Sequence, residues 1–226
     1  MTDEILNQGE QFVTEYKANV EALTSAHAYN PADEHDACGV GMIAAIDGKP
    51  RRSVVEKGIE ALKAVWHRGA VDADGKTGDG AGIHIQVPQQ FFHDYVKLIG
   101  HIPPDRPLAV GQVFLPRLSL EAQERCRCIV ETEILNFGYY IYGWRQVPVN
   151  EAACGIASRA VAPRIAQLFV GAGDDAGDQD AFERKLYVIR RGVERADLEN
   201  LAIPSFSSRT MAVSYTHLTL PTILLV

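Results

Sequence analysis

The sequence predicts an α+β or α/β fold built from short apolar strands and amphipathic helices. Apolar runs of strand length alternate along the chain with longer segments whose apolar residues recur every three or four positions. No glycine fingerprint for dinucleotides follows any of the expected strands. With 226 residues and a hydrophobic content of 46%, the chain can bury a core as one large domain or two small ones.

The first expected element is an amphipathic helix over residues 3–25, because apolar residues recur there at steps of three and four. The pair Asn30-Pro31 separates this helix from the next segment. Residues 39–46 then form an apolar run that predicts a buried strand, and Asp47-Gly48 predicts the turn after it.

A second helix is expected from Ser53 to Trp66. Ser53 is the predicted N-cap, with Glu56 at the capping-box position, and the apolar residues between Val54 and Trp66 form one face. A glycine-rich loop follows this helix.

Beyond the loop, the pattern predicts five further strands and three further helices. The expected strands are 81–87, 109–115, 139–147, 165–170 and 205–211, and the expected helices are 88–95, 119–137 and 182–199. Residues 171–180 are expected to form a solvated loop. The helix over 119–137 has the clearest pattern. Its expected inner residues are Leu120, Ile129, Ile134 and Leu135.

The charge of the chain is concentrated before residue 38. The whole chain has 29 acids and 22 bases, a net charge of −7, and residues 1–37 alone carry eight acids and one base. The remainder is balanced and has no dense basic patch, which argues against a nucleic-acid partner. The sequence also lacks an apolar stretch of about 18 residues and a secretory signal, so we expect a cytoplasmic protein with no membrane partner.

Cys38 is the candidate nucleophile. A cysteine needs a base or a lowered pKa to become a thiolate. Removal of residues 1–37 would free an α-amino group, whose ordinary pKa of about 7.7 to 8.0 suits that base. Gly39 and Gly41 leave room for a substrate. A lone Cys-Gly pair is also compatible with a buried structural cysteine at the start of a strand.

Other residues have competing interpretations. Arg68 fits either a site role or a structural salt bridge, and His67 fits a packed side chain better than a partner of the thiol. The loop around Gly78, Asp79 and Gly80 could be a plain turn or a phosphate cradle, but the Lys-Ser/Thr pair of a phosphate loop is missing.

The remaining three cysteines receive no chemical role. Four cysteines at irregular spacing without an export signal predict free thiols. Cys126 and Cys128 lie two positions apart in an expected helix, so their side chains should face different directions and not share a metal. Cys154 is expected in the core.

Four motifs occur together in a specific order: CGVGMIA, HRGA, TGDGAG and GWRQVPVN. From about Pro31 to Met211 the chain resembles the class II, N-terminal-nucleophile glutamine amidotransferase domain of the glutamate synthase family. This resemblance implies a four-layer αββα sandwich of the N-terminal-nucleophile hydrolase type, incomplete at its C-terminus.

The resemblance also implies the chemistry. Cys38 would attack the carboxamide of L-glutamine and form a thioester, and water would then release glutamate. Arg68, Gly39, Gly78, Asp79 and Gly80 would support the site. In the full-length enzyme the ammonia would serve the reductive amination of 2-oxoglutarate. That reaction implies FMN and an iron–sulfur cluster in the missing synthase part, and it is compatible with a small electron-transfer subunit as a partner.

The chain departs from the family in what it lacks. The family's carboxylate-binding arginine and its oxyanion-hole Asn-Gly pair belong to segments beyond the last matching residue, so the chain as written is expected to be inactive alone. Two alternatives remain open. One is a stand-alone amidohydrolase of the same nucleophile class, and the other is a non-catalytic fragment or binding module that keeps residues 1–37.

The C-terminal segment is a separate question. Residues 213–222, VSYTHLTLPT, resemble the translation of a transposon-type sequencing adapter, although an ordinary β-rich C-terminus would have a similar composition. We therefore expect a propeptide over 1–37, a partial class II amidotransferase domain over 38–211, and a non-native tail over 212–226.

Overall fold

The structure is a computed structural model that describes residues 2–26, 39–65, 73–78, 80–173 and 177–215. The chain divides into two compact units, Met1–Gly39 and Val40–Val226.

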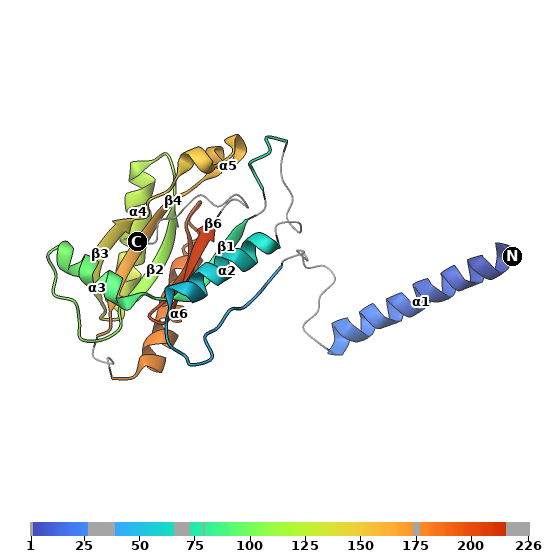
Figure 1. Ribbon diagram of the computed structural model, residues 1–226, viewed down its shortest axis with the longest axis horizontal. Coiled ribbons are helices and arrows are strands. Elements are labelled where there is room, and N and C mark those ends of the chain that lie inside the picture. The colour runs from blue at the N-terminus through green and yellow to red at the C-terminus, as the bar shows by residue number, and fades with distance from the viewer. Residues whose placement is uncertain (1, 27–38, 66–72, 79, 174–176, 216–226) are drawn as a thin grey trace. The chain divides into compact units, whose positions relative to one another are not determined.

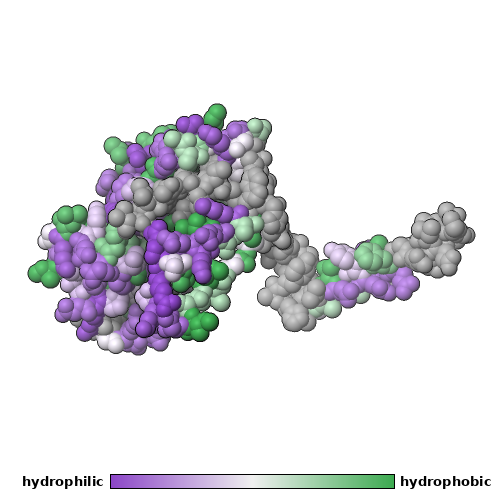
Figure 2. Space-filling model, in the orientation of Figure 1, coloured by the Kyte–Doolittle hydropathy of each residue, from purple (hydrophilic) through white to green (hydrophobic). Residues whose placement is uncertain are grey.

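The first unit contains one long helix, α1 (Thr2–Ala26), and this confirms the helix expected over 3–25 (Figure 1). Gln11 donates a hydrogen bond to Glu15 one turn later, at 3.0 Å. Phe12 is 69% exposed, and apolar residues are visible on the surface of the helix in Figure 2. No helix in the described part of the chain is long and apolar enough to cross a membrane.

The second unit contains two antiparallel sheets, which confirms the α+β class and excludes α/β for the described strands. The four-stranded sheet has the order β3–β4–β2–β5, formed by Tyr140–Gln146, Arg164–Gly171, Ala109–Leu115 and Ala202–Ser207. The two-stranded sheet pairs β1 (Ala81–Gln86) with β6 (Thr210–Tyr215).

In the second unit, helices precede β1 and follow β1, β2, β3 and β4. They are α2 (Arg52–Ala64), α3 (Gln89–Leu98), α4 (Leu120–Asn136), the short 3-10 helix η2 (Glu151–Ala153), α5 (Ile156–Val161) and α6 (Gln179–Arg195). The expected strand at 109–115 and the expected helix at 119–137 are confirmed to within one residue at each end. The 3-10 helix and α5 have no counterpart among the expected elements.

One core lies between the four-stranded sheet and the pair α4 and α6. Val113 and Leu168 point from β2 and β4 toward Val130 of α4 and Leu186 of α6, and all four side chains are buried. Apolar burial of this kind stabilises a domain by about 25 cal/mol per Å² removed from water.

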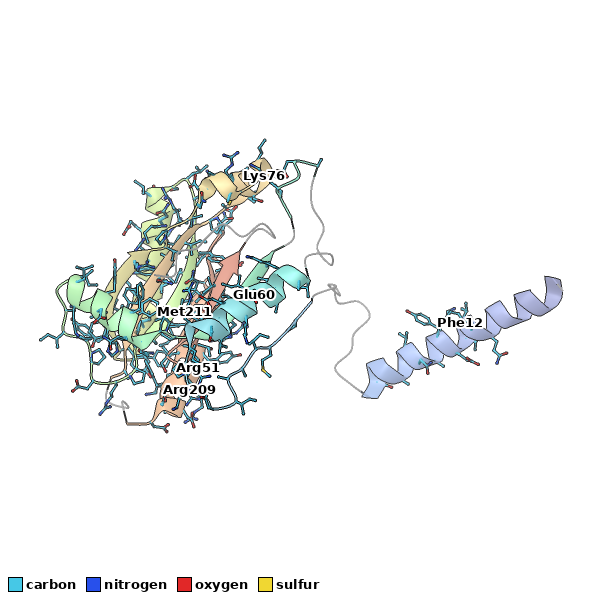
Figure 3. All side chains as sticks on the ribbon, viewed as in Figure 1. Phe12, Arg51, Glu60, Lys76, Arg209 and Met211 are labelled. Atoms are coloured by element: carbon cyan, nitrogen blue, oxygen red, sulfur yellow. The ribbon has the colours of Figure 1, made fainter. Side chains whose placement is uncertain are left out.

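A second core occupies the opposite face of the same sheet. Val110 of β2 and Phe169 of β4 pack there with Met211 and Val213 of β6 and with Phe92 of α3. Alternation along β2 and β4 therefore supplies two cores at once, because successive side chains point to opposite faces. Figure 3 labels Met211, which lies on β6 within the second unit.

The expected strand at 39–46 is wrong. The structure gives this segment no strand, and Val40, Met42 and Ile46 are exposed. A strand requires a hydrogen-bonded neighbour, and no described strand pairs with these residues. The turn after it is confirmed: Gly48 adopts φ +66° and donates from its N–H to the Ala45 carbonyl at 3.0 Å.

The capping box expected at Ser53 is also wrong. The N-cap of α2 is Arg51, two residues before Ser53, and it has no side-chain cap hydrogen bond. In α4, by contrast, Ser119 is the N-cap and accepts a hydrogen bond from Ala122 N at 3.1 Å. Whether a serine caps a helix depends on where the helix begins. Ser119 is the residue just before α4, whereas Ser53 lies inside α2.

The buried face of α4 differs from the expected one. Leu120 and Leu135 are exposed, and the buried side chains are Gln123, Cys126, Val130 and Ile134. Their spacing of three and four forms one stripe, and the sheet beneath selects this stripe. Cys126 is buried and Cys128 is exposed, which confirms that the two thiols face different directions.

The expected strand at 205–211 is two strands. β5 ends at Ser207 and β6 begins at Thr210, so the chain leaves the four-stranded sheet and enters the two-stranded one within two residues. Glu183 of α6 holds this crossing, because it accepts hydrogen bonds from Ser208 N at 2.8 Å and from the Ser207 hydroxyl at 2.7 Å. The expected helix end at 199 is also wrong, since α6 ends at Arg195.

A row of polar side chains runs across the sheet in register. Arg145 of β3 donates to Gln167 of β4 at 2.9 Å, and Gln167 donates to Gln112 of β2 at 3.3 Å. Ser205 of β5 is aligned with Gln112 and accepts from Ala212 N at 2.9 Å. Both glutamines are only 4% exposed, so any other pairing of these strands would leave buried amides without partners.

This row predicts a stability effect. Replacement Gln167→Ala should reduce the free energy of unfolding by about 1–3 kcal/mol, because it removes the hydrogen-bond partner that Gln112 and Arg145 share. Urea unfolding of the variant and the parent measures the effect. Gln90→Ala on the exposed face of α3 is the matched control, with an expected change within about 0.5 kcal/mol. Equal effects of the two substitutions would contradict the role given to the row.

Candidate functional site

The structure describes only some of the site residues that the sequence predicts. Gly39, Gly78 and Gly80 are described, whereas Cys38, Arg68 and Asp79 lie outside the described residues. His67 also lies outside them. What the structure defines is the framework around the glycine-rich loop.

A tight turn precedes this loop. The carboxylate of Asp74 accepts hydrogen bonds from Lys76 N at 2.9 Å, from Thr77 N at 2.6 Å and from the Thr77 hydroxyl at 2.6 Å. Gly75 adopts φ +66° between them, a conformation that glycine allows without strain. An aspartate that bonds to its own following backbone in this way forms an Asx-turn.

The same carboxylate reaches a distant part of the chain. Ile156 N donates to Asp74 Oδ2 at 3.0 Å, across 82 positions of sequence. Ile156 is the first residue of α5, and Figure 3 shows Lys76 of the turn beside that helix. Asp74 therefore connects the chain before β1 with the chain after β3.

Hydrogen bonding also determines the charge of Asp74. The bond from the Thr77 hydroxyl, followed by those from the N–H groups of Thr77 and Lys76, lowers the pKa of this carboxyl far below its ordinary value. The Asp74 carboxylate therefore stays ionised at pH values at which an ordinary aspartate is already protonated.

Gly155 makes the contact between the two segments possible. A Cβ atom at this position would lie 2.6 Å from Thr77 N and would overlap Thr77 Oγ1 and Asp74 Oδ2. The backbone of Gly155 has an ordinary φ of −66°, so the need for glycine comes from the close approach and not from the turn.

Residues 150–156, which contact the Asp74 turn, are held in place by several interactions. Asn150 caps η2 by accepting a hydrogen bond from Ala152 N at 3.2 Å. Cys154 is 5% exposed and its thiol lies 3.9 Å from the Asn150 carbonyl, which confirms the expectation that it is a core residue. Val147 N donates to Ile165 O at 3.0 Å, so the segment continues directly from the pairing of β3 with β4.

The GWR motif has a structural role. Gly143 has φ +139° at an irregularity in the β3–β4 pairing, and Ile99 would lie 3.2 Å from a Cβ there. Trp144 donates to Glu131 of α4 at 2.6 Å, while Arg145 stacks over Phe91 of α3 at 5.3 Å. The two side chains thus fix β3 from opposite faces of the sheet.

Other places in the described part fit a reaction centre less well. No group of three or more His, Cys, Asp or Glu residues in that part could hold a metal ion. A shallow cavity lined by Arg106, Asp178, Phe182 and Ser208, among others, contains none of the expected site residues.

Sequence reasoning missed both Asp74 and the segment 150–156. The local signal was present, since Asp74-Gly75 followed by Thr77 is typical of an Asx-turn. No local pattern indicates the bond to Ile156, because its two partners are brought together only by the sheets.

Comparison with known proteins gives a consistent result. A family model for class-II glutamine amidotransferases matches residues 38–224. The large chain of the NADPH glutamate synthase of Azospirillum brasilense is 67% identical over 215 residues, which is 93% of this chain and 14% of that protein.

More distant relatives agree. The corresponding large chain of Bacillus subtilis is 38% identical over 169 residues, covering 74% of this chain and 11% of the relative. The ferredoxin-dependent glutamate synthase 2 of Synechocystis is 37% identical over 181 residues, covering 79% and 11%. The chain thus spans one seventh or less of the length of these relatives.

The lowered pKa of Asp74 predicts a pH dependence of stability. The unfolded state binds this proton first as the pH falls below about 4, so the contribution of Asp74 is complete above that value and declines below it. Asp74→Asn should therefore flatten the fall in unfolding free energy between about pH 4 and pH 2. Urea unfolding at several pH values tests this, and parallel curves for the variant and the parent would contradict it.

Proposed function

The chain belongs to the class-II glutamine amidotransferase family, and we propose that it is the glutamine-hydrolysing part of a glutamate synthase large chain. The match of the family model to the chain begins at residue 38, the position of the expected nucleophile, and this observation supports the proposal most directly. The names of the three relatives support the assignment to glutamate synthase.

The proposed reaction uses Cys38 and its own α-amino group. The amino group takes the thiol proton, and the thiolate attacks the side-chain carbonyl carbon of L-glutamine. The carbon–nitrogen bond then breaks, and ammonia leaves with the proton from the ammonium group. Water attacks the thioester, the carbon–sulfur bond breaks, and glutamate leaves as the thiol is restored. The amino group is available only after residues 1–37 have been removed.

The remaining site residues are proposed to support this chemistry. Arg68 would hold the surroundings of Cys38, and Gly39, Gly78, Asp79 and Gly80 would leave the space in which the substrate lies. Within the described part of the chain, and apart from the two neighbours of Gly80, no heavy atom lies within 4 Å of the place where a Cβ on Gly80 would stand, and this open space is consistent with such a role.

We further propose that the domain is completed as a four-layer αββα sandwich. Two arrangements support this: α4 and α6 pack on the outer face of the four-stranded sheet, and Leu62 of α2 packs against the core that contains residues of β1 and β6. The proposed boundaries are 1–37 for the propeptide, 38–211 for the native part of the domain and 212–226 for the tail.

The complete protein would pass the ammonia to the reductive amination of 2-oxoglutarate. FMN and an iron–sulfur cluster, which supply and carry the electrons when bound, would belong to the synthase part of the full-length protein. The described cysteines do not fit a cluster, since Cys126 and Cys154 are buried and Cys128 faces solvent on α4. The names of the relatives divide between NADPH and ferredoxin as electron donor, and a small electron-transfer subunit is the proposed partner for the first type.

The role of Cys38 can be tested in the full-length protein. Cys38→Ser should reduce glutamine-dependent glutamate synthesis by at least about 100-fold, because it removes the thiolate nucleophile. Synthesis from added ammonia should persist. Enzyme assays with each nitrogen source measure both activities.

Two observations complete that experiment. Cys128→Ser on the exposed side of α4 is the matched control and should leave both activities unchanged. The intact mass of the parent protein should correspond to a chain that begins at Cys38. Loss of both activities in Cys38→Ser, or a leader that stays attached in an active enzyme, would contradict the proposed mechanism.

The proposed tail predicts the result of a DNA experiment. A long sequencing read of the source DNA across the codon for Met211 should continue into codons different from VSYTHLTLPTILLV. Any native continuation must still supply a strand, because β6 runs to Tyr215 and Val213 lies in the second core. The family match extends to residue 224, beyond the proposed start of the tail. A read that reproduces the printed tail and a stop codon would refute the adapter origin.

A further inference from the structure

We propose that Asp74 is a positioning residue for glutamine hydrolysis, which anchors the glycine-rich loop that begins at Gly78 to the segment 150–156. The inference rests on the proposed function. In this inference Asp74 acts through the backbone that it holds.

Asp74 uses both carboxylate oxygens. Oδ1 accepts from the N–H groups of Lys76 and Thr77, and Oδ2 accepts from the Thr77 hydroxyl and from Ile156 N. One oxygen therefore closes the local turn, and the other also forms the cross-link to the distant segment. With both oxygens engaged by donors and the pKa lowered, Asp74 is unsuited to act as a general base.

The anchor lies next to the loop that it holds. Thr77 is joined directly to Gly78, and β1 begins at Ala81, three residues beyond. Among the described residues other than its chain neighbours, none comes within 4 Å of the place where a Cβ on Gly80 would stand. The Asp74 anchor holds the chain just before the loop, and the pairing of β1 with β6 holds the chain just after it.

The other partner of the anchor is part of the framework. Residues 150–156 follow β3, and they are held by the Asn150 cap and by buried Cys154. β3 belongs to the four-stranded sheet and β1 to the two-stranded sheet. Asp74 thus links the residues before β1, in the two-stranded sheet, to the residues after β3, in the four-stranded sheet. The proposed function places the loop next to this link beside Cys38.

The close contact at Gly155 supports this interpretation. The turn and the segment approach so closely that a single added methyl group would displace Thr77 or Asp74. Displacement of about 1 Å at a catalytic framework can reduce a rate by about 100-fold. Substitutions at Asp74 and at Gly155 should therefore impair glutamine hydrolysis in the same way. Asp74 forms the hydrogen bond to Ile156, and Gly155 permits the close approach that this bond requires.

The experiment uses the full-length protein with three variants at the anchor. Asp74→Ala should lower kcat for glutamine-dependent synthesis by about 10- to 100-fold, with synthesis from ammonia unchanged. Asp74→Asn keeps one acceptor oxygen and should recover part of the loss. Gly155→Ala keeps the carboxylate but forces the segments apart, and it should resemble Asp74→Ala.

A matched control separates the anchor from a general effect of losing an aspartate. Asp178 caps α6 by accepting from Asp180 N and Ala181 N, in the same way that Asp74 closes its turn. It belongs to the cavity that contains none of the expected site residues. Asp178→Ala should leave kcat with glutamine within about twofold of the parent.

Limited proteolysis provides a readout that does not depend on activity. Trypsin cleaves after Lys76, which is exposed within the turn, and docking of the turn should slow this cleavage. Cleavage at this bond should accelerate in Asp74→Ala and not in Asp178→Ala.

The outcomes are distinct. If the parent enzyme makes no glutamate from glutamine, the proposed function fails and the positioning role fails with it, even if trypsin still detects the anchor. If the parent is active but Asp74→Ala matches Asp178→Ala in kcat, the inference alone is overturned. Equal loss of glutamine-dependent and ammonia-dependent synthesis in Asp74→Ala would also overturn it, because the residue would then serve the whole fold.

Discussion

The buried hydrogen bond between Gln167 and Gln112 sets the register of the central strands, and most of the second unit depends on that register. Side chains alternate along a strand, so a slip of one residue would exchange the faces of β4. Leu168 would then leave the core under α4 and α6, and Phe169 would leave the core that includes Met211. Such a slip would also separate two buried amides, which adds a penalty of about 1–3 kcal/mol for each group left unpaired. A polar contact thus specifies an arrangement that apolar burial alone would define less sharply.

The same register allows the chain to pass from one sheet to the other. Gly111 lies opposite Phe206, and a Cβ on it would come within 3.2 Å of that ring, so β2 and β5 pair closely. Immediately beyond, Glu183 and Gln89 hold Ser208, the residue at which the crossing occurs. β6 is thereby placed beside β1, with Met211 facing Phe169 across the second core. Figure 3 shows that Arg209 of this crossing and Lys76 of the Asp74 turn lie at opposite ends of the sheets.

The functional framework follows from where the strands end. β1 begins just after the glycine-rich loop, and β3 ends just before residues 150–156, so the Asp74 carboxylate can bridge two parts of the chain that are 82 positions apart. The motif that contains Trp144 and Arg145 contributes by fixing β3 between α4 and α3, at a distance from the reacting groups. The GWRQVPVN motif, which helps to identify the family, therefore also stabilises the four-stranded sheet in this protein. The chemistry is assigned to Cys38, and the geometry that the structure describes belongs to its support.

The sequence by itself determined the features that depend on neighbours along the chain. These include the strand at 109–115, the helix over 119–137, the Asp47-Gly48 turn and the ordered motifs around Cys38 that indicate the family. Only the tertiary structure decided which stripe of α4 is buried, that residues 39–46 have no described partner strand, and that Asp74 binds Ile156. The physical reason is the same in each case. A turn or a cap is stabilised by atoms within a few residues, whereas burial, strand pairing and a cross-link require a partner whose position is set by the whole fold.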